Sequence, residues 1–354
     1  MKPVLFATGH APPYRIGALA RLHEREDVEV ALFGGRFKHG GEPSEGEPPF
    51  PSRRVRPREL WGLAGSGAYR AVVCPTAGRL APAACWAGAR RAGVPLILWT
   101  SLWAHPRTPA HTASYIALRR LYRSADAVVT YGPHVSAYVR ERGARNVHVA
   151  PQAVDNDFWR AEGPTEPPRS PWPAGAKTRF LFAGRRAREK GLTVLDAAWR
   201  QAGLDAEAAI ALVGVGADMA AAPGWVCLDP VGPSELRSLY ATSHVLVLPS
   251  VRTATFREPW GLVINEAMNK GLAVIASDAV GAAAGGLVRE GINGLIVPAG
   301  DAHALAAALR RLAGDGELRR RLGAQAAEDV LAFNHDAWAR GFSAALASVG
   351  LGRW

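Results

Sequence analysis

Two groups of charged residues, each set among glycines, have the spacing of a phosphate- and sugar-binding site. The first follows an apolar stretch, residues 180–183, that ends in Gly184-Arg185 and is followed by Lys190-Gly191. An arginine can fork two phosphate oxygens while a lysine supplies a point charge, so Arg185 and Lys190 on one strand-to-helix loop suit a diphosphate. Because these cations would neutralise the diphosphate, we expect no metal ion, and we count Gly184 among the donor contacts.

The second group consists of Glu258 and Glu266, eight residues apart, on either side of the Trp260-Gly261-Leu262 segment. A glycine at a helix start lets backbone N–H groups approach a phosphate closely, and a helix N-terminus favours negative charge. Glu258 precedes the expected helix and Glu266 lies within it, so the two carboxylates can reach different hydroxyls of one long ligand. One suits a ribose and the other a second sugar, and together the two groups indicate a sugar-nucleotide site.

Each piece alone has a simpler interpretation. A single Arg or Lys on a loop is more often a solvated surface charge. Glu258 and Glu266 alone would fit a helix cap and a surface helix position. The hypothesis therefore depends on the ordered set of motifs and not on any one of them.

These segments resemble the retaining GT-B glycosyltransferases of family 4 (GT4). In that family a strand, Gly-Arg and Lys-Gly precede two glutamates separated by seven residues, and glycine-rich segments follow, as at residues 274–281 and 290–298 here. The likeness covers the C-terminal half well. It implies that Arg185 and Lys190 bind the diphosphate, that Glu266 binds the ribose hydroxyls and that Glu258 binds the transferred sugar.

The resemblance also implies donor contacts from the first half. The family carries a glycine pair after its first strand, which Gly17 matches only in part because alanine follows it. Gly17 would present a backbone N–H to the diphosphate, assisted by Arg15; a plain helix start is the alternative. A histidine after the fourth strand contacts the donor sugar in the family, and His105 is our candidate, with His111 as the alternate.

The family places the nucleotide base near the loop at residues 229–231, so Val231 is expected to contact it through its backbone. The glycines at residues 214 and 216 could cradle the nucleotide edge. They do not form a dinucleotide fingerprint, because the third glycine is missing.

Short apolar runs bounded by Gly and Pro alternate with helical stretches, which is typical of an α/β protein with parallel sheets. Strands are expected at residues 4–8, 28–33, 71–74, 96–100, 127–130, 147–149, 180–183, 209–213, 225–228, 245–249, 273–276 and 294–297. Helices are expected at residues 16–24, 82–92, 113–124, 135–141 and, at the end of the chain, about 318–348. Residues 163–173 contain five prolines and are interpreted as an interdomain linker or a peripheral loop near it.

The 354-residue length suits two domains. We expect residues 1–160, joined by about 338–354, to form an N-terminal acceptor-binding Rossmann-like domain, and residues 161–337 to form the donor-binding one. By the resemblance these doubly wound domains face each other across a cleft, and the C-terminal helix crosses back to the N-terminal domain.

Charge is unevenly divided along the chain. Residues 1–156 carry 21 Lys and Arg against 11 Asp and Glu, a net charge of +10, whereas the remainder carries 21 against 20. A basic first half would attract an anionic membrane, a lipid carrier or another acidic acceptor; an arginine-rich but merely solvated surface is the alternative. Nucleic acid is not expected, because the basic residues are scattered.

Other features bound the cellular setting. No run of 18 apolar residues occurs, and the apolar part of the N-terminus is too short for a secretory signal. We therefore expect a cytoplasmic protein, peripheral at the inner face of the membrane if the basic half binds lipid. Cys74, Cys85 and Cys227 lack metal-ligand spacing and are expected to be small buried residues without a role.

The expected activity is metal-independent, retaining transfer of a hexose-type sugar from a UDP- or GDP-sugar to the hydroxyl of a glycan, lipid carrier or small molecule. Such reactions serve bacterial polysaccharide, glycolipid or natural-product glycoside synthesis. No cofactor beyond the nucleotide-sugar co-substrate is expected. The alternatives are a GT-B sugar-nucleotide epimerase and a non-catalytic nucleotide-sugar binding protein.

Overall fold

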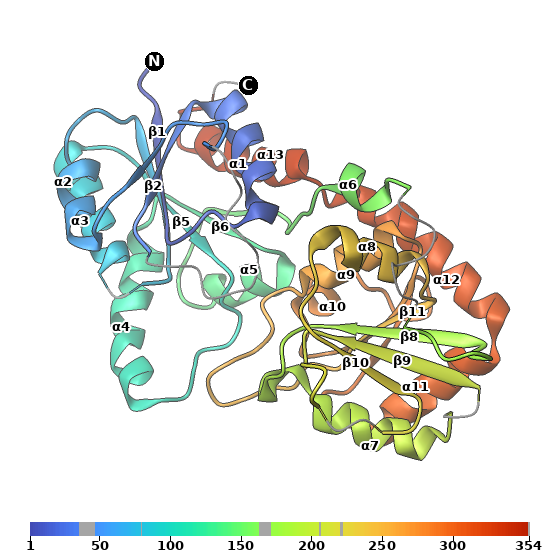
Figure 1. Ribbon diagram of the computed structural model, residues 1–354. Helices are drawn as coiled ribbons and strands as arrows, with labels where there is room; N and C mark the ends of the chain where they lie inside the picture. Colours follow the sequence, from blue (N-terminus) through green and yellow to red (C-terminus); the bar gives the residue numbers. More distant parts are fainter. Residues whose placement is uncertain (35–46, 79, 163–170, 205–206, 220–221, 353–354) are drawn as a thin grey trace. The chain divides into compact units, whose positions relative to one another are not determined.

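The protein is described from a computed structural model covering residues 1–34, 47–78, 80–162, 171–204, 207–219 and 222–352. The chain forms two compact units (Figure 1). The N-terminal unit consists of Met1–Asp155 with Asn334–Trp354, and the C-terminal unit of Asn156–Phe333. Most of the proline-rich segment at 163–173 lies outside the described residues. The change of unit falls earlier, between Asp155 and Asn156, and Trp172 is buried and donates to Thr242 of the C-terminal unit.

The N-terminal unit is built on a seven-stranded sheet in which every neighbouring pair is parallel, with the order β3-β2-β1-β4-β5-β6-β7. The strands are β1 (Val4–Thr8), β2 (Val28–Leu32), β3 (Ser52–Arg54), β4 (Ala71–Pro75), β5 (Leu96–Thr100), β6 (Ala127–Thr130) and β7 (Val147–Val149). The expected strands are confirmed. The additional edge strand β3 escaped prediction because its three residues are exposed and polar, so they give no apolar run.

The helices of this unit are α1 (Pro13–Glu26), η1 (Pro57–Glu59), α2 (Leu60–Ala64), α3 (Ala81–Ala92), α4 (Pro109–Ser124), α5 (Pro133–Arg140) and α13 (His335–Ser348). Three of them, α1, α4 and α5, begin two to four residues before their predicted starts. Each of these has proline in its first helical turn, where a missing N–H costs nothing and the fixed φ is already helical.

The C-terminal unit contains a six-stranded sheet, again parallel throughout, in the order β10-β9-β8-β11-β12-β13. Its strands are β8 (Thr178–Ala183), β9 (Ala208–Val213), β10 (Trp225–Leu228), β11 (Val245–Leu248), β12 (Ala273–Ser277) and β13 (Gly294–Val297). Its helices are α6 (Asn156–Arg160), η2 (Arg188–Lys190), α7 (Leu192–Ala202), α8 (Pro233–Ala241), α9 (Leu262–Asn269), α10 (Gly281–Ala284), α11 (Ala302–Gly314), α12 (Gly316–Asp329) and η3 (Val330–Ala332). Both units are therefore doubly wound α/β domains.

The expected single helical stretch at 318–348 is wrong in one respect, because it is broken. Helix α12 and η3 end the C-terminal unit, and α13 starts afresh after Asn334. The Asn334 side chain caps α13 by accepting a hydrogen bond from the Ala337 N–H at 2.8 Å. The break thus coincides with the change of unit.

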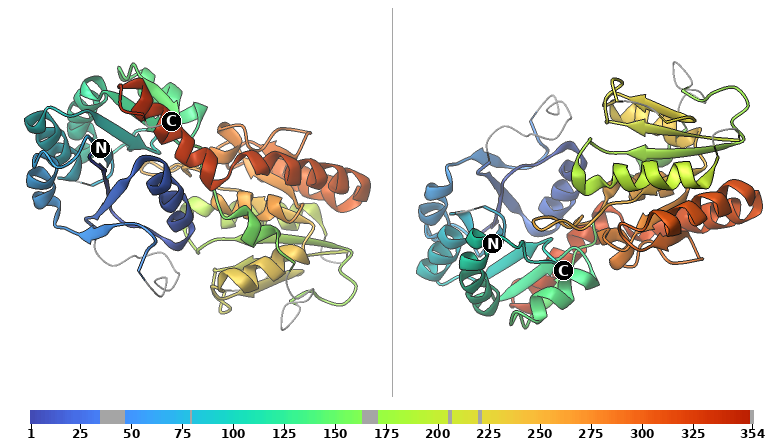
Figure 2. Two further views of the ribbon diagram at one scale, coloured as in Figure 1. Left: turned by 90° about the horizontal axis from the view of Figure 1, so that it is seen from above. Right: turned by 90° about the horizontal axis from the view of Figure 1, so that it is seen from below.

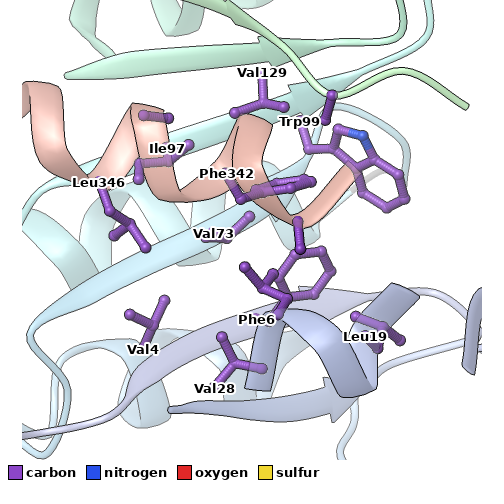
Figure 3. Close-up of a cluster of buried hydrophobic side chains, with 14 of the residues drawn as sticks. Val4, Phe6, Leu19, Val28, Val73, Ile97, Trp99, Val129, Phe342 and Leu346 are labelled. Atoms are coloured by element: carbon purple, nitrogen blue, oxygen red, sulfur yellow. The ribbon is translucent and has the colours of Figure 1, made fainter. Parts of the chain in front are cut away.

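Helix α13 packs within the N-terminal unit against α1, β6 and β7, so the red end of the chain lies with the blue and cyan elements in Figure 2. Gly341 makes this close approach possible, because a Cβ there would lie 2.3 Å from the Val149 carbonyl oxygen. Phe342 and Leu346 belong to a buried apolar cluster that includes Phe6 of β1 (Figure 3), and the Phe342 and Phe6 ring centres are 5.4 Å apart. This anchoring confirms the expected return of the C-terminal helix to the N-terminal domain.

The cysteines follow their expectation in part. Cys74 and Cys85 are buried, but Cys227 is partly exposed. Within the described residues, no helix is long and apolar enough to cross a membrane. No cluster of three or more His, Cys, Asp or Glu suited to a metal ion occurs there either.

Candidate functional site

The candidate residues of the C-terminal unit gather at the carboxyl edge of its sheet, where parallel strands end side by side. Arg185 follows β8, and the segment containing Glu258 follows the neighbouring strand β11. The glycine loop around Gly281 follows β12, the next strand in the sheet. Ligands of doubly wound folds bind at this edge, because the loops there face one another.

A buried ion pair joins two of the predicted site residues. The Lys190 ammonium donates to the Glu258 carboxylate with 2.5 Å between Nζ and Oε2, and the two side chains are only 15% and 10% exposed. The Ser250 hydroxyl donates to the same carboxylate oxygen at 3.3 Å. An ammonium has three N–H donors, so Lys190 retains donors for a ligand while Glu258 holds it in place.

Glycine brings the lysine loop close to the end of β11. Gly191 has φ of 72°, and a Cβ on it would lie 2.0 Å from the Pro249 carbonyl oxygen. The loops are also tied by a 2.9 Å hydrogen bond from the Val251 N–H to the Glu189 carbonyl. Any larger residue at 191 would therefore push Lys190 away from Glu258.

Arg185 lies on the same loop and is more exposed. Its guanidinium donates to Glu189 at 2.8 Å, and 56% of its side chain is accessible. Glu189 is the residue whose carbonyl binds the β11 loop, so Arg185 is anchored to the same group of loops as Lys190. A guanidinium carries five N–H donors, which leaves most of them available for phosphate oxygens.

The segment carrying Glu258 is held by the loop after β12. The Gly281 N–H donates to the Glu258 carbonyl at 3.0 Å, and the Ala282 N–H donates to the Trp260 carbonyl at 2.8 Å. A Cβ on Gly281 would lie 1.9 Å from the Pro259 carbonyl oxygen. The second glycine loop thus positions the first glutamate through backbone contacts.

Gly261 caps α9 with φ of 94°, where a Cβ would meet the Leu248 side chain at 2.7 Å. Leu262 is the first helical residue, and the first amides of a helix have no acceptor within it. This end can therefore receive a phosphate. The Trp260 ring points instead into the unit: it is 3% exposed, stacks near Phe333 and donates to Asn265, so its side chain has a packing role.

Glu266, the fifth residue of α9, is partly buried and accepts a hydrogen bond from the Tyr240 hydroxyl at 2.9 Å. Burial raises the pKa of Glu266 to about 7, although the Tyr240 hydrogen bond acts in the opposite direction. The carboxyl is thus poised between its neutral and charged forms near neutral pH. Its role toward a ribose stays a prediction.

The remaining donor candidates lie at neighbouring strand ends. The Gly184 N–H donates to the Val213 carbonyl, and the Gly184 carbonyl lies 3.0 Å from where a Cβ of Gly214 would be. Val231 is partly exposed in the loop after β10, where the Asp229 side chain accepts from the Ala217 N–H. The glycine after β9 thus allows two neighbouring loops to come together.

Two predicted residues, Gly17 and His105, belong to the N-terminal unit. Because α1 begins at Pro13, Gly17 lies in the second turn and not at the helix entrance. Its missing Cβ makes room for the His335 ring, which such an atom would approach to 2.5 Å. This contact with α13 was not foreseen.

His105 is held by its own unit. Its Nε2 lies 2.7 Å from the His111 carbonyl oxygen, and its Nδ1 lies 3.4 Å from the Tyr138 hydroxyl. The alternate, His111, pairs its Nδ1 with the Thr108 hydroxyl at the start of α4. The proposed contact of either histidine with a sugar stays a prediction.

A cavity of about 400 Å³ opens at the carboxyl edge of the N-terminal sheet. Its lining includes His10, Arg15, Trp99 and Tyr131, and His105 is not among the lining residues. No single sequence motif marks this cavity, because its walls come from five separate segments, which lie at the ends of β1, β2, β4, β5 and β6.

Sequence reasoning also missed three positioning groups in the C-terminal unit, namely Ser250, Tyr240 and the backbone role of Gly281. Tyr240 and Ser250 are each 0% exposed, and the sequence alone indicates only ordinary buried residues at these positions. Gly281 lay in a noted glycine loop, which was the one available signal. Each of the three contacts a glutamate that lies eight or more residues away in the chain, outside any motif they share.

Comparison with known proteins gives two family matches. The model described as "Glycosyl transferase 4-like domain" matches residues 4–153, and "Glycosyl transferases group 1" matches residues 177–315. The first corresponds to the N-terminal unit and the second contains Arg185, Lys190 and both glutamates.

Curated relatives match over part of their length. A D-inositol 3-phosphate glycosyltransferase of Corynebacterium glutamicum is 41% identical over 110 residues, which cover 30% of this chain and 24% of that protein. The Nocardia farcinica protein of the same name is 32% identical over 154 residues, covering 40% of this chain and 33% of that protein. The matched segments thus span a quarter to a third of these relatives.

Solved structures share the fold over the whole chain. Sucrose-phosphate synthase from Thermosynechococcus elongatus has a TM-score of 0.73 at 20% identity, with 99% of both chains covered. HepE from Anabaena, solved in complex with UDP-glucose, has a TM-score of 0.73 at 18% identity and covers 98% of this chain and 100% of that one. Together with the two family matches, these likenesses show that the chain belongs to the group 1 (GT4) glycosyltransferases and has the GT-B fold.

Proposed function

We propose that the protein is a retaining glycosyltransferase that moves a hexose-type sugar from a UDP- or GDP-sugar to an acceptor hydroxyl. The observation that carries this proposal is the buried Lys190–Glu258 pair beside Arg185 at the carboxyl edge of the C-terminal sheet. Two cations and a carboxylate, held there by glycine turns, match the charge pattern of a sugar diphosphate.

The reaction would proceed on one face of the sugar. As the bond between the anomeric carbon and the diphosphate oxygen breaks, negative charge grows on the leaving group. Preorganised cations at Arg185 and Lys190 and the first amides of α9 would stabilise that charge. The acceptor oxygen would bond to the anomeric carbon on the same face, and its proton would pass to the departing phosphate.

Glu258 and Glu266 would divide the recognition of hydroxyls. Glu258, fixed by Lys190 and Ser250, would orient the transferred sugar. Glu266 would accept hydrogen bonds from the ribose when its carboxyl is charged. No metal is assigned, because the side chains described already supply the cations.

The donor and acceptor classes draw on the relatives. HepE was solved with UDP-glucose, which favours a UDP-hexose as the first donor to test. The curated relatives bear the name D-inositol 3-phosphate glycosyltransferase, which makes a phosphorylated polyol the first acceptor to test. Glycan, lipid-carrier and small-molecule acceptors complete the panel.

The decisive experiment incubates the protein with labelled UDP- and GDP-hexoses, with EDTA and with or without the acceptor panel. Transfer supports the proposal, isomerisation of the donor alone indicates an epimerase, and binding without turnover indicates a non-catalytic binding protein. Arg185→Ala should abolish most transfer while the fold stays intact. Arg200→Ala is the matched control, because Arg200 is an equally exposed arginine in an i,i+4 ion pair.

We further propose peripheral contact with anionic membranes through the N-terminal unit. Residues 48–125 contain twelve arginines and Glu59 as their sole acid. Trp61 of α2 and Trp86 of α3 are 46% and 38% exposed, and the Arg91 and Arg90 guanidiniums lie over their rings. Tryptophan at the headgroup level with arginines beside it suits an anionic bilayer surface.

Sedimentation with phosphatidylglycerol vesicles tests this contact. Binding should fall steeply as salt rises from 50 to 500 mM, since exposed charges are screened. The variant Trp61→Ser/Trp86→Ser should bind several-fold less. Vesicle binding that does not depend on salt concentration, or no binding at all, would refute the membrane contact. Neither result would bear on the proposed transfer reaction.

A further inference from the structure

The N-terminal unit buries an arginine without an acidic partner. Arg15 is 5% exposed, and its guanidinium lies 5.2 Å from the centres of both the Trp99 and Trp338 rings. Its hydrogen bond goes to the neutral amide oxygen of Gln152. No carboxylate in the described part of the chain forms an ion pair with it. Burying a charge costs folding free energy unless the charge is paired. The Arg15 guanidinium is therefore suited to bind an anion that is not part of this unit.

Unsatisfied donors surround the same point. Among the described residues, the Arg15 Nη1, the Trp99 Nε1 and the Trp338 Nε1 are buried and have no acceptor. The Trp99 and Trp338 rings are adjacent, with 5.8 Å between their centres. A buried donor that makes no hydrogen bond costs about 1–3 kcal/mol of stability. Three such donors side by side therefore indicate a site for a ligand that is rich in hydrogen-bond acceptors.

The cavity described above begins at this cluster. Arg15 and Trp99 line it, and so do Thr100, Ser101 and Tyr131, three residues that carry hydroxyl groups. Aspartate and glutamate are absent from its lining, so nothing there repels an anion. A volume of about 400 Å³ accommodates a ligand the size of a sugar phosphate.

We propose that this cavity is a phosphate subsite in which Arg15 binds a phosphomonoester on the sugar-like acceptor. The inference rests on the proposed glycosyltransferase function and names the class of acceptor. The phosphate would pair with the buried guanidinium, and the aromatic rings that flank Arg15 fix the direction of its N–H groups. The rest of the acceptor would occupy the hydroxyl-lined part of the cavity.

Matched probes test the subsite directly. Glucose 6-phosphate, glucose and inorganic phosphate are titrated calorimetrically into the wild type, Arg15→Gln and Arg120→Gln. Arg120 is an exposed arginine of α4 and serves as the control. We expect glucose 6-phosphate to bind at least tenfold more tightly than glucose, Arg15→Gln to erase that difference, and the control to keep it. Equal binding of both probes to the wild type would overturn the proposal.

A second arm separates this subsite from the donor site. Phosphate could instead bind beside Arg185 in the C-terminal unit. In that case Arg185→Ala would abolish phosphate binding and Arg15→Gln would retain it. That result would refute the subsite at Arg15. UDP titration should be unchanged by Arg15→Gln. If the protein transfers no sugar, these titrations still report on Arg15, so the two proposals fail separately.

The source of the phosphate is separated by a third probe. Phosphatidic acid in vesicles is compared with glucose 6-phosphate, because a lipid phosphate and a free sugar phosphate share the same anion. An Arg15-dependent response to glucose 6-phosphate alone indicates a soluble acceptor, and a response to both indicates a lipid-linked one. Arg15→Met, which removes the unpaired charge, tests whether a loss of binding reflects misfolding. Without ligand, this variant should have the same or a higher unfolding temperature than the wild type.

Discussion

The carboxyl edges of the two sheets hold their cations in opposite ways. In the C-terminal unit each candidate cation has a carboxylate partner, Lys190 with Glu258 and Arg185 with Glu189. In the N-terminal unit Arg15 lies between aromatic rings, and its hydrogen bond goes to a neutral amide. The cations of the C-terminal site are neutralised by carboxylates of the protein before a ligand binds. By our proposal, Arg15 in the N-terminal site is neutralised only by the ligand.

The two edges are also shaped by different means. Glycines bring the backbone loops together in the C-terminal unit, where a Cβ at residue 191 or 281 would collide with a carbonyl oxygen. Large buried rings from β1, β5 and α13 surround the edge of the N-terminal unit. A site built from backbone contacts leaves a motif in the sequence, and one built from packed side chains does not.

The largest expected effect comes from breaking the charge balance at the C-terminal edge. Lys190→Met removes a cation that we propose stabilises the departing diphosphate, so kcat should fall about 10²–10³-fold. It also breaks the ion pair of the Glu258 carboxylate, whose side chain is only 10% exposed, which should cost about 3 kcal/mol in urea unfolding. Adding Glu258→Gln should restore most of the stability but not the turnover. Normal kinetics in the single variant would show that the pair is only structural.

The aromatic packing of the N-terminal edge is tested by Trp338→Ala. Trp338 is 0% exposed and contacts Phe342 with 4.5 Å between ring centres, so its loss should cost about 4 kcal/mol. Urea unfolding measures the loss, and Trp86→Ala on the exposed face of α3 is the control. UDP binding should survive in both. A Trp338 variant as stable as its control would contradict this account of how α13 is anchored.

The glycine dependence of the C-terminal edge is tested by Gly281→Ala. Its Cβ would overlap the Pro259 carbonyl, which should cost about 3 kcal/mol and displace Glu258. Gly314→Ala at the end of α11 meets no atom within 4 Å and should be neutral or stabilising. Thermal unfolding of the pair makes the comparison. Equal stability would mean that the loop after β12 adapts without cost.

The smallest effect is a pH dependence from Glu266. Its pKa of about 7 lies above the ordinary value of 4.5, so the folded state binds this proton more tightly than the unfolded state. The resulting stabilisation is present below pH 4.5 and is lost as the pH rises through 7. The free energy of unfolding of Glu266→Gln, relative to that of the wild type, should therefore increase by on the order of 2 kcal/mol when the pH is raised from 4 to 8. Parallel stability curves would show that Glu266 titrates normally.

Much of the fold could be predicted because parallel strands buried on both faces are short apolar runs. Strands such as Leu96–Thr100 and Trp225–Leu228 have the predicted bounds. The exposed strand Ser52–Arg54 could not be found, since nothing apolar marks it. The cap at Asn334 was missed because its polar signal is a single residue inside a long helical pattern.

The candidate site divides in the same way. The order of the motifs predicts that Lys190 and Glu258 belong to one site, and the structure brings them into contact. Ser250 and Tyr240, which hold the two glutamates, could not be predicted, because neither belongs to a motif and both resemble ordinary buried residues in the sequence. Likewise, the sequence allows Gly17 to be a phosphate contact or a plain helix start. Neither interpretation reveals that its missing Cβ makes room for His335, more than 300 residues later in the chain.

By itself the sequence determined the α/β class, the family likeness and the ordered set of cations, glutamates and glycines in the second half, because these depend on local periodicity and spacing. Only the tertiary structure decided that Lys190 is neutralised by Glu258 and that Glu266 is partly buried against Tyr240. It alone placed Arg15 between Trp99 and Trp338 without a carboxylate. Charge balance and burial depend on which distant segments pack together, and that information exists only once the chain has folded.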